Sequence, residues 1–254
     1  MILLIKRNNL IFCALVLTLC LTILGVNLAY DGGGEAVSAS VVPVVSSTKK
    51  IVVLDAGHGG EDPGAVSSFN GIKEKDVTLV IANKTKELLE KSGYKVIMTR
   101  TEDVLNYDDE NGSMTAKRRQ DLLKRKKIMD ESGADIVVSI HLNSYPESKY
   151  SGAQTFYTKN SLSGKKLATK IQESLKINVD PENDREALQK KEDILITKDC
   201  KVTTVIVECG FLSNETECVK LGDEAYQKKL SEAIKTGIDQ YFTTLVPKPT
   251  ESKK

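Results

Sequence analysis

The chain has 254 residues, with 36 Lys and Arg against 35 Asp and Glu, so its formal net charge is +1. A nucleic-acid-binding protein usually carries a clear basic excess, so this balance argues against nucleic acid as a partner. Apolar residues make up 40% of the chain, which is typical of a globular protein rather than a disordered one. Only two histidines occur, so each can be considered individually.

The first 30 residues predict export. Lys6 and Arg7 precede an almost wholly apolar run over residues 10–29, and about 20 such residues suffice to span a bilayer. The basic flank should stay cytoplasmic, which places the rest of the chain outside the cytoplasm, either secreted or membrane-anchored. We expect residues 1–30 to form a signal or anchor. An uncleaved anchor is favoured because residues 27–29 (NLA) make a poor small-x-small cleavage site. Residues 31–50 predict a linker.

Three cysteines remain after this leader: Cys200, Cys209 and Cys218. Without Lys6 and Arg7, 34 basic residues face 35 acidic ones, and the exported part has a net charge of −1. An odd number of cysteines is not a disulfide framework, and none of the three has the spacing of a metal site. We expect Cys209 to be a buried thiol, and a Cys200–Cys218 bridge stays open.

Residues 51–245 predict one α/β domain, because short apolar strands alternate with amphipathic helices. The expected strands, in chain order, cover residues 51–54, 94–99, 135–140, 153–157 and 202–207. The expected helices cover residues 73–91, 114–132, 163–177 and 225–242, and the apolar side of the second would be Leu122, Leu123, Ile128 and Met129. The alternation predicts a mostly parallel, twisted sheet with helices on both faces, and residues 246–254 a polar tail.

Three reactive side chains stand at predicted strand ends. His58 follows the first strand in DAGHGG, His141 follows the third in SIHLNS, and Glu208 closes the last in VECGFLSN. In a parallel sheet these ends lie along one edge, where ligands bind. A single histidine is usually structural, but the only two of the chain occupy equivalent positions, which favours metal ligation. A Glu that closes an apolar strand is costly to bury without a partner, which favours a functional role.

The glycine-rich stretch GHGGEDPG matches neither GxGxxG nor a P-loop, so we expect no nucleotide. A hydrolytic zinc site needs three protein ligands and an open position for water. Besides the two histidines, Glu74 is a candidate because it stands at the start of the first predicted helix. Glu61 and Asp62, which are close to His58 on a loop, remain alternatives at this point.

Four blocks in order, LDAGHGGEDPGA, KEKD, SIHLNS and VECGFLSN, resemble the zinc-dependent N-acetylmuramoyl-L-alanine amidases over about residues 51–242. The resemblance implies that His58, Glu74 and His141 bind Zn²⁺ and that Glu208 is the catalytic carboxylate. Zinc would lower the pKa of a water molecule, and Glu208 would accept its proton. The amide between the lactyl group of muramic acid and L-alanine of the peptidoglycan stem would then be cleaved, with Glu208 protonating the departing amine.

The apolar N-terminus, the block RRQDLLKRKKIMDESGADIVVSIHLNS and the cysteine in VECGFLSN resemble the spore-cortex branch of this family. That branch implies cortex maturation through muramic lactam, a role in germination, and a location between the forespore membranes. It also implies a partner protein that controls activity or metal loading. Residues 178–193 are short and polar, so we expect no helix that plugs the site.

Two other functions stay open from the sequence. A zinc carboxypeptidase or endopeptidase would use the same ligands but cut within the stem peptide. A non-catalytic wall-binding protein would keep the fold and need no base, and the presence of Glu208 weighs against it.

Overall fold

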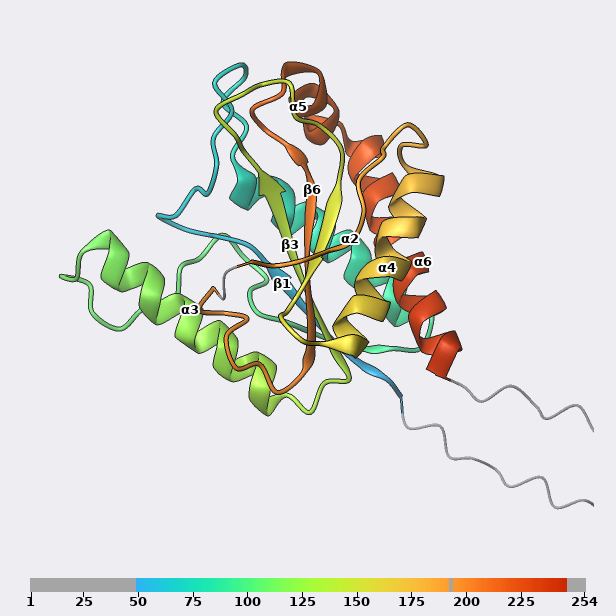
Figure 1. Cartoon of the computed structure of the whole chain (residues 1–254). Helices are drawn as coiled ribbons and strands as arrows, with labels where there is room; N and C mark the ends of the chain where they lie inside the picture. Colours follow the sequence, from blue (N-terminus) through green and yellow to red (C-terminus); the bar gives the residue numbers. More distant parts are fainter. Residues whose placement is uncertain (1–48, 192–193, 246–254) are drawn as a thin grey trace, which may run out of the picture. The chain divides into compact units, whose positions relative to one another are not determined.

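A six-stranded sheet with the strand order β2-β1-β3-β6-β4-β5 organises the domain (Figure 1). The computed structural model describes residues 49–191 and 194–245. The strands are β1 (Ile51–Ala56), β2 (Lys95–Met98), β3 (Ile136–Asn143), β4 (Gln154–Tyr157), β5 (Leu188–Gln189) and β6 (Thr203–Phe211). The helices are α2 (Glu74–Lys91), α3 (Met114–Glu131), α4 (Leu162–Asn178), α5 (Glu215–Gly222) and α6 (Glu224–Leu245).

The N-terminal anchor, nearly all of the linker and the polar tail that the sequence predicts lie outside the described residues. Within residues 49–191 and 194–245, no helix combines the length and the apolar character that a membrane span requires.

The α/β prediction is confirmed, and the sheet is mixed. Strands β2, β1, β3 and β6 run parallel, whereas β4 pairs antiparallel with β6 and β5 follows the direction of β4. A parallel crossover takes about a dozen residues or more, usually with a helix, and the short segment 144–153 between β3 and β4 contains none. The chain therefore turns back at the edge where β3 ends and enters β4 in the opposite direction.

The two faces of the sheet are covered differently (Figure 1). Val52, Leu54 and Ala56 of β1 belong to the large apolar core, to which α2, α4 and α6 contribute. The intervening Val53 belongs to a small cluster with Met129 of α3, Val137 and Ile196. Side chains alternate between the two faces of a strand, so neighbouring residues of β1 pack against helices on opposite faces. The prediction of helices on both faces is therefore confirmed.

The apolar stripes predicted for α4 and α6 are buried in the large core. Leu167, Ile171 and Leu175 of α4 have no exposed surface. On α6, a Cβ at Gly237 would lie 2.5 Å from the Cα of Ile171, so the absence of a side chain lets the two helices approach closely.

The predicted apolar side of α3 is only partly correct. Met129 is buried and Leu122 is partly buried as predicted, but Leu123 is 44% exposed, and the other buried residues of the helix are Asp121 and Arg125. Two charged side chains therefore face the sheet where the hydrophobic pattern indicated leucines. The polar partners that make this possible belong to the functional site.

Sequence reasoning missed α5 and the short β5. The Asn214 side chain accepts a hydrogen bond from the Glu217 backbone N–H at the start of α5, a capping arrangement that NETE in the sequence indicates. Cys209 is buried as predicted, and the Cys200–Cys218 bridge that the sequence left open is not formed, because Cys200, Cys209 and Cys218 are all free thiols. Cys218 is instead buried on α5.

Candidate metal centre and active site

Three predicted donors meet at the edge of the sheet. Nε2 of His58 lies 3.2 Å from Oε2 of Glu74, and Nδ1 of His141 lies 2.9 Å from Oε1 of the same carboxylate. One ligand atom from each residue falls within 4.8 Å of the other two. His58 comes from the turn after β1, Glu74 from the first position of α2, and His141 from β3. The expectation that the carboxyl ends of parallel strands meet at one edge is therefore correct for His58 and His141, and the start of α2 adds Glu74.

The two sequence alternatives to Glu74 lie elsewhere. Glu61 is exposed and pairs with Lys117 at 3.1 Å. Asp62 approaches the opposite nitrogen of His58, with 2.8 Å between Oδ2 and Nδ1. Asp62 therefore orients the imidazole and leaves Nε2 facing the centre, as carboxylates commonly do behind metal-binding histidines.

Two glycines make room for the imidazoles. A Cβ at Gly57 would lie 2.4 Å from Cε1 of His141, and a Cβ at Gly64 would lie 2.5 Å from Oε2 of Glu74. Gly64 also has a φ of 65°, a left-handed conformation that other residues adopt at a cost. Gly57 and Gly64 thus define the space around the donors.

Backbone amides fix the carboxylate of Glu74, which is only 3% exposed. Oε2 accepts from Ala65 N–H at 2.9 Å, and Oε1 accepts from Leu142 N–H at 3.0 Å. The first turn of a helix also favours negative charge. The negative group is therefore in place before any cation binds.

Contacts between the histidines and the carboxylates shift their pKa values in opposite directions. Burial opposes protonation of His58, but hydrogen bonds and charge from Asp62 and Glu74 raise its pKa to about 9. Burial would raise the pKa of Glu74, yet His141 and His58 hold it well below its usual range. Protons and a metal ion compete for the same nitrogen and oxygen atoms.

Glu208 stands beside this cluster on β6, directly across from His141 on β3 and from Gln154 on β4. Its Oε2 is buried, and no described residue provides a hydrogen-bond partner for it. Burial raises the pKa of Glu208, with the positive charge of His141 opposing the shift. A carboxylate with one free oxygen and an elevated pKa is suited to accept and return a proton.

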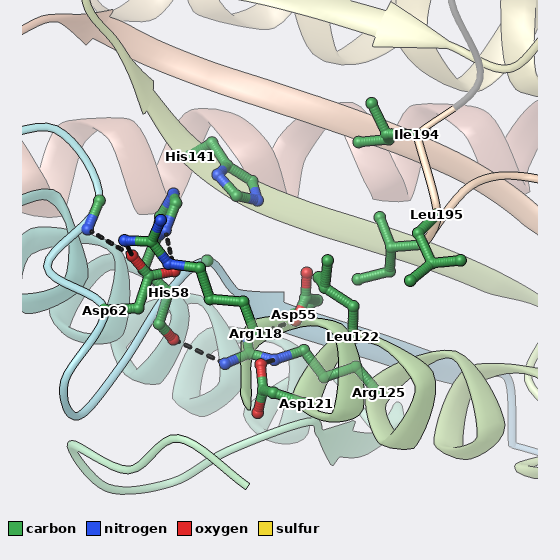
Figure 2. A pocket seen from close by; sticks show the side chains of 13 residues that line it. Asp55, His58, Asp62, Arg118, Asp121, Leu122, Arg125, His141, Ile194 and Leu195 are labelled. Atoms are coloured by element: carbon green, nitrogen blue, oxygen red, sulfur yellow. Dashed lines mark hydrogen bonds and ion pairs between the residues drawn. The ribbon is translucent and has the colours of Figure 1, made fainter. Parts of the chain in front are cut away.

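A pocket of about 430 Å³ opens at the two histidines (Figure 2). One wall is α3, with Arg118 and Leu122, and the other is the segment Ile194, Leu195 and Ile196. The pocket therefore joins a polar end at the histidines to one apolar wall, Ile194–Ile196, and one wall on α3 that mixes charged and apolar side chains.

Sequence reasoning missed the charged residues that also line this pocket: Asp55, Arg118, Asp121 and Arg125. Asp55 is the first residue of DAGHGG, and Asp121 and Arg125 stand four residues apart on α3 with Met129 four further on. The four-residue spacing of these side chains indicates a buried face that carries charges. The sequence analysis overlooked it because the adjacent Leu122 and Leu123 indicated a different buried side.

The donor set itself tests whether a metal fits. Two imidazole nitrogens and one carboxylate, with space on the pocket side, match the ligands of a hydrolytic zinc ion. Fold and site together define the class as a single-domain α/β protein with a candidate His–Glu–His metal centre beside a buried carboxylate.

A family model described as N-acetylmuramoyl-L-alanine amidase matches residues 52–240, and the chain belongs to that family. The predicted enzyme class is thereby confirmed.

Individual relatives agree with this assignment. The chain is 38% identical over 194 residues to the germination-specific N-acetylmuramoyl-L-alanine amidase of Bacillus subtilis, covering 76% of this chain and 80% of the relative. Among solved structures, the CwlD amidase from Clostridioides difficile, in complex with the GerS lipoprotein, is 47% identical with a TM-score of 0.75. The match covers 77% of this chain and all of that one. An N-acetylmuramoyl-L-alanine amidase from Clostridium difficile 630 is 29% identical with a TM-score of 0.67, over 78% and 99% of the two chains.

Proposed function

We propose that this amidase is zinc-dependent, with His58, Glu74 and His141 as the metal ligands and Glu208 as the catalytic carboxylate. Its substrate is peptidoglycan, and the bond cleaved joins the lactyl group of N-acetylmuramic acid to L-alanine of the stem peptide. The observation that carries the proposal is the convergence of three donor atoms within 4.8 Å next to a carboxylate whose buried oxygen has no hydrogen-bond partner among residues 49–191 and 194–245.

The chemistry of the chain's own residues is a proton relay. Zinc, when bound, would polarise the lactyl carbonyl and lower the pKa of a water molecule. Glu208 takes a proton from the attacking water and returns it to the nitrogen of L-alanine, which must leave as an amine. Its raised pKa makes the carboxylate a better proton acceptor for the first step, and the resulting carboxylic acid is still acidic enough to protonate the departing amine.

The pocket supports a bulky, mixed substrate. Its apolar side chains, Leu122 and Ile194–Ile196, offer contact area, while Arg118 at the rim carries a positive charge. A glycan strand with a stem peptide presents apolar sugar faces and anionic peptide groups. The reacting amide would lie at the histidine end.

The cellular role follows from the relatives. We infer that the chain acts on spore cortex, where removal of whole stem peptides precedes muramic-lactam formation, and so contributes to germination. Support comes from the name of the Bacillus subtilis relative and from the similarity to the CwlD amidase. That amidase was solved with a lipoprotein, which supports a partner protein of this kind for the present chain as well.

The domain organisation belongs to the same proposal. Residues 1–30 serve as signal or membrane anchor, 31–50 as linker, 51–245 as the catalytic domain and 246–254 as a polar tail. The catalytic domain would act outside the cytoplasm, between the forespore membranes.

Digestion of cortex and vegetative peptidoglycan by the purified protein, with and without zinc, tests this function by mass spectrometry of the products. Free L-alanine N-termini on released peptides, with intact glycan, support the amidase. Release of D-alanine, or cleavage between stem residues, supports a carboxypeptidase or endopeptidase instead. Wall binding without metal-dependent cleavage supports a non-catalytic protein.

A further inference from the structure

The backbone of His58 is the strained part of the proposed metal site. Its φ is 62°, a left-handed conformation that a non-glycine residue adopts only when its surroundings hold it there. Its main-chain oxygen accepts a hydrogen bond of 2.6 Å from Nη2 of Arg125 on α3. Nη1 of the same guanidinium donates to the Ala56 oxygen, two residues earlier. One side chain therefore holds both ends of the turn that presents His58.

Arg125 is itself held from the other side. It is 1% exposed, and its Nε donates to Asp121 at 2.6 Å and its Nη1 to Asp55 at 2.9 Å. Asp55 also accepts 2.6 Å hydrogen bonds from Thr99 and Ser139. These contacts tie α3 to β1, β3 and the end of β2, so the guanidinium has little freedom to move.

Stability alone is a weak explanation for this network. Replacing buried ion pairs by well-packed apolar residues is often neutral or stabilising, because charges lose their hydration on burial. Val53 and Met129, which precede Asp55 by two residues on β1 and follow Arg125 by four on α3, are buried in an apolar cluster. What an apolar side chain would not supply is the pair of donors to the Ala56 and His58 carbonyls.

A second contact from α3 reaches the ring of His58. Arg118 donates to Oδ1 of Asp62 at 2.6 Å, and Oδ2 of Asp62 lies 2.8 Å from Nδ1 of His58 (Figure 2). Arg125 and Arg118 are seven residues apart, two turns along one face of α3. The same helix therefore restrains the main chain of His58 through one arginine and its imidazole through the other.

We propose that Arg125 is a positioning residue for the metal site, which holds His58 in the left-handed conformation that points Nε2 at the centre, with Arg118 and Asp62 orienting the ring. The inference rests on the proposed zinc site. It assigns α3 a role in metal binding, beyond its role as a wall of the pocket.

The test is the zinc dissociation constant of the full chain, measured by competition with a fluorescent chelator, for wild type and Arg125→Lys. Lysine keeps the charge but not the planar fork, so it cannot hold Asp55, Asp121 and both carbonyls at once. We expect affinity to fall by roughly 10- to 100-fold, the usual effect of losing a group that orients a metal ligand. Leu175→Ala, in the core on the opposite face, controls for lost stability and should keep wild-type affinity.

Arg118→Met tests the contact between Arg118 and Asp62. The Arg118 side chain is 47% exposed, so the substitution does not disturb a buried position. Arg119→Met is its matched control, since it removes the same charge one residue away from an exposed position. Arg118→Met should weaken zinc binding several-fold, and the absorption bands of the Co²⁺-loaded protein should shift for it and for Arg125→Lys. Arg119→Met should change neither.

The proposal is overturned if Arg125→Lys, folded by circular dichroism, binds zinc as tightly as wild type, or if Leu175→Ala loses as much affinity. It is equally overturned if Arg118→Met and Arg119→Met behave alike and Arg125→Lys leaves the Co²⁺ spectrum unchanged. Failure of the proposed function gives a different result. In that case wild type itself binds no zinc, or His58→Ala binds it as well as wild type does.

Discussion

On one face of the sheet, Val52, Leu54 and Ala56 pack into a continuous apolar core with α2, α4 and α6. On the other face, the intervening Val53 and Asp55 of the same strand meet α3, which buries Asp121 and Arg125. The first face follows the hydrophobic pattern and holds the large apolar core. The second departs from it and carries the pocket, because positioning a histidine and a carboxylate takes hydrogen bonds that apolar packing does not provide. Changes on the two faces should therefore have separable effects.

The largest effect should come from removing zinc from the proposed site. Dialysis against a chelator should abolish peptidoglycan cleavage, and adding zinc back should restore it, because zinc would be the group that polarises the carbonyl and activates the water. The measurement is product release by mass spectrometry alongside metal content. Full activity in a sample shown to be free of metal would contradict the assignment of His58, Glu74 and His141.

Glu208→Gln should be nearly as severe. Glutamine keeps the size of the side chain but cannot accept a proton, so kcat should fall by roughly 10²- to 10⁴-fold. Zinc content should stay at the wild-type level, because Glu208 is not among the clustered donors. Turnover close to wild type in the zinc-loaded variant would remove Glu208 from the mechanism.

Leu167→Ala, on the face of the sheet opposite to α3, should change stability and leave catalysis intact. Leu167 is fully buried on α4, and truncation of such a leucine costs about 2–5 kcal/mol in free energy of unfolding. Urea denaturation should show this loss, while kcat of the folded protein at 25 °C should stay close to wild type. A large fall in kcat without a stability change would mean that the two faces are not separable.

The smallest effect is a pH dependence of stability from Asp55. Burial would raise the pKa of Asp55, but Arg125, His141, Ser139 and Thr99 together lower it from an ordinary 3.8 to about 2. At 1.36 kcal/mol per pKa unit, the ionised carboxylate contributes about 2 kcal/mol. Because the folded-state pKa is the lower one, this contribution is complete above about pH 4 and is lost as the pH falls towards 2.

Asp55→Asn provides the comparison for that titration. Its free energy of unfolding, measured in urea between pH 5 and pH 2, should lack this part of the acid dependence, so the gap to wild type should narrow as the pH falls. The other carboxylates titrate in both proteins and cancel. An unchanged gap would show that folding does not lower the pKa of Asp55.

Much of the site could be predicted because it follows from strand ends. His58, His141 and Glu208 each follow or close an apolar strand, and the parallel arrangement of β1, β3 and β6 brings such ends to one edge. The choice between Glu74 and Asp62 could not be made from spacing. It depends on the path of residues 59–73, where Gly64 and backbone donors direct Glu74 towards the centre and leave Asp62 behind His58.

The sequence by itself determined the alternation of strands and helices, the core stripes of α4 and α6, and the edge at which the reactive side chains gather. These features depend on the spacing of apolar residues within single strands and helices, which can be read from short stretches of the sequence. Tertiary structure alone decided that β4 pairs with β6 and that α3 turns Asp121 and Arg125 inward. The reason is the same in both cases: the partners are distant in sequence. Arg125 is buried because Asp55 and the carbonyls of Ala56 and His58, some 70 residues earlier, satisfy its donors.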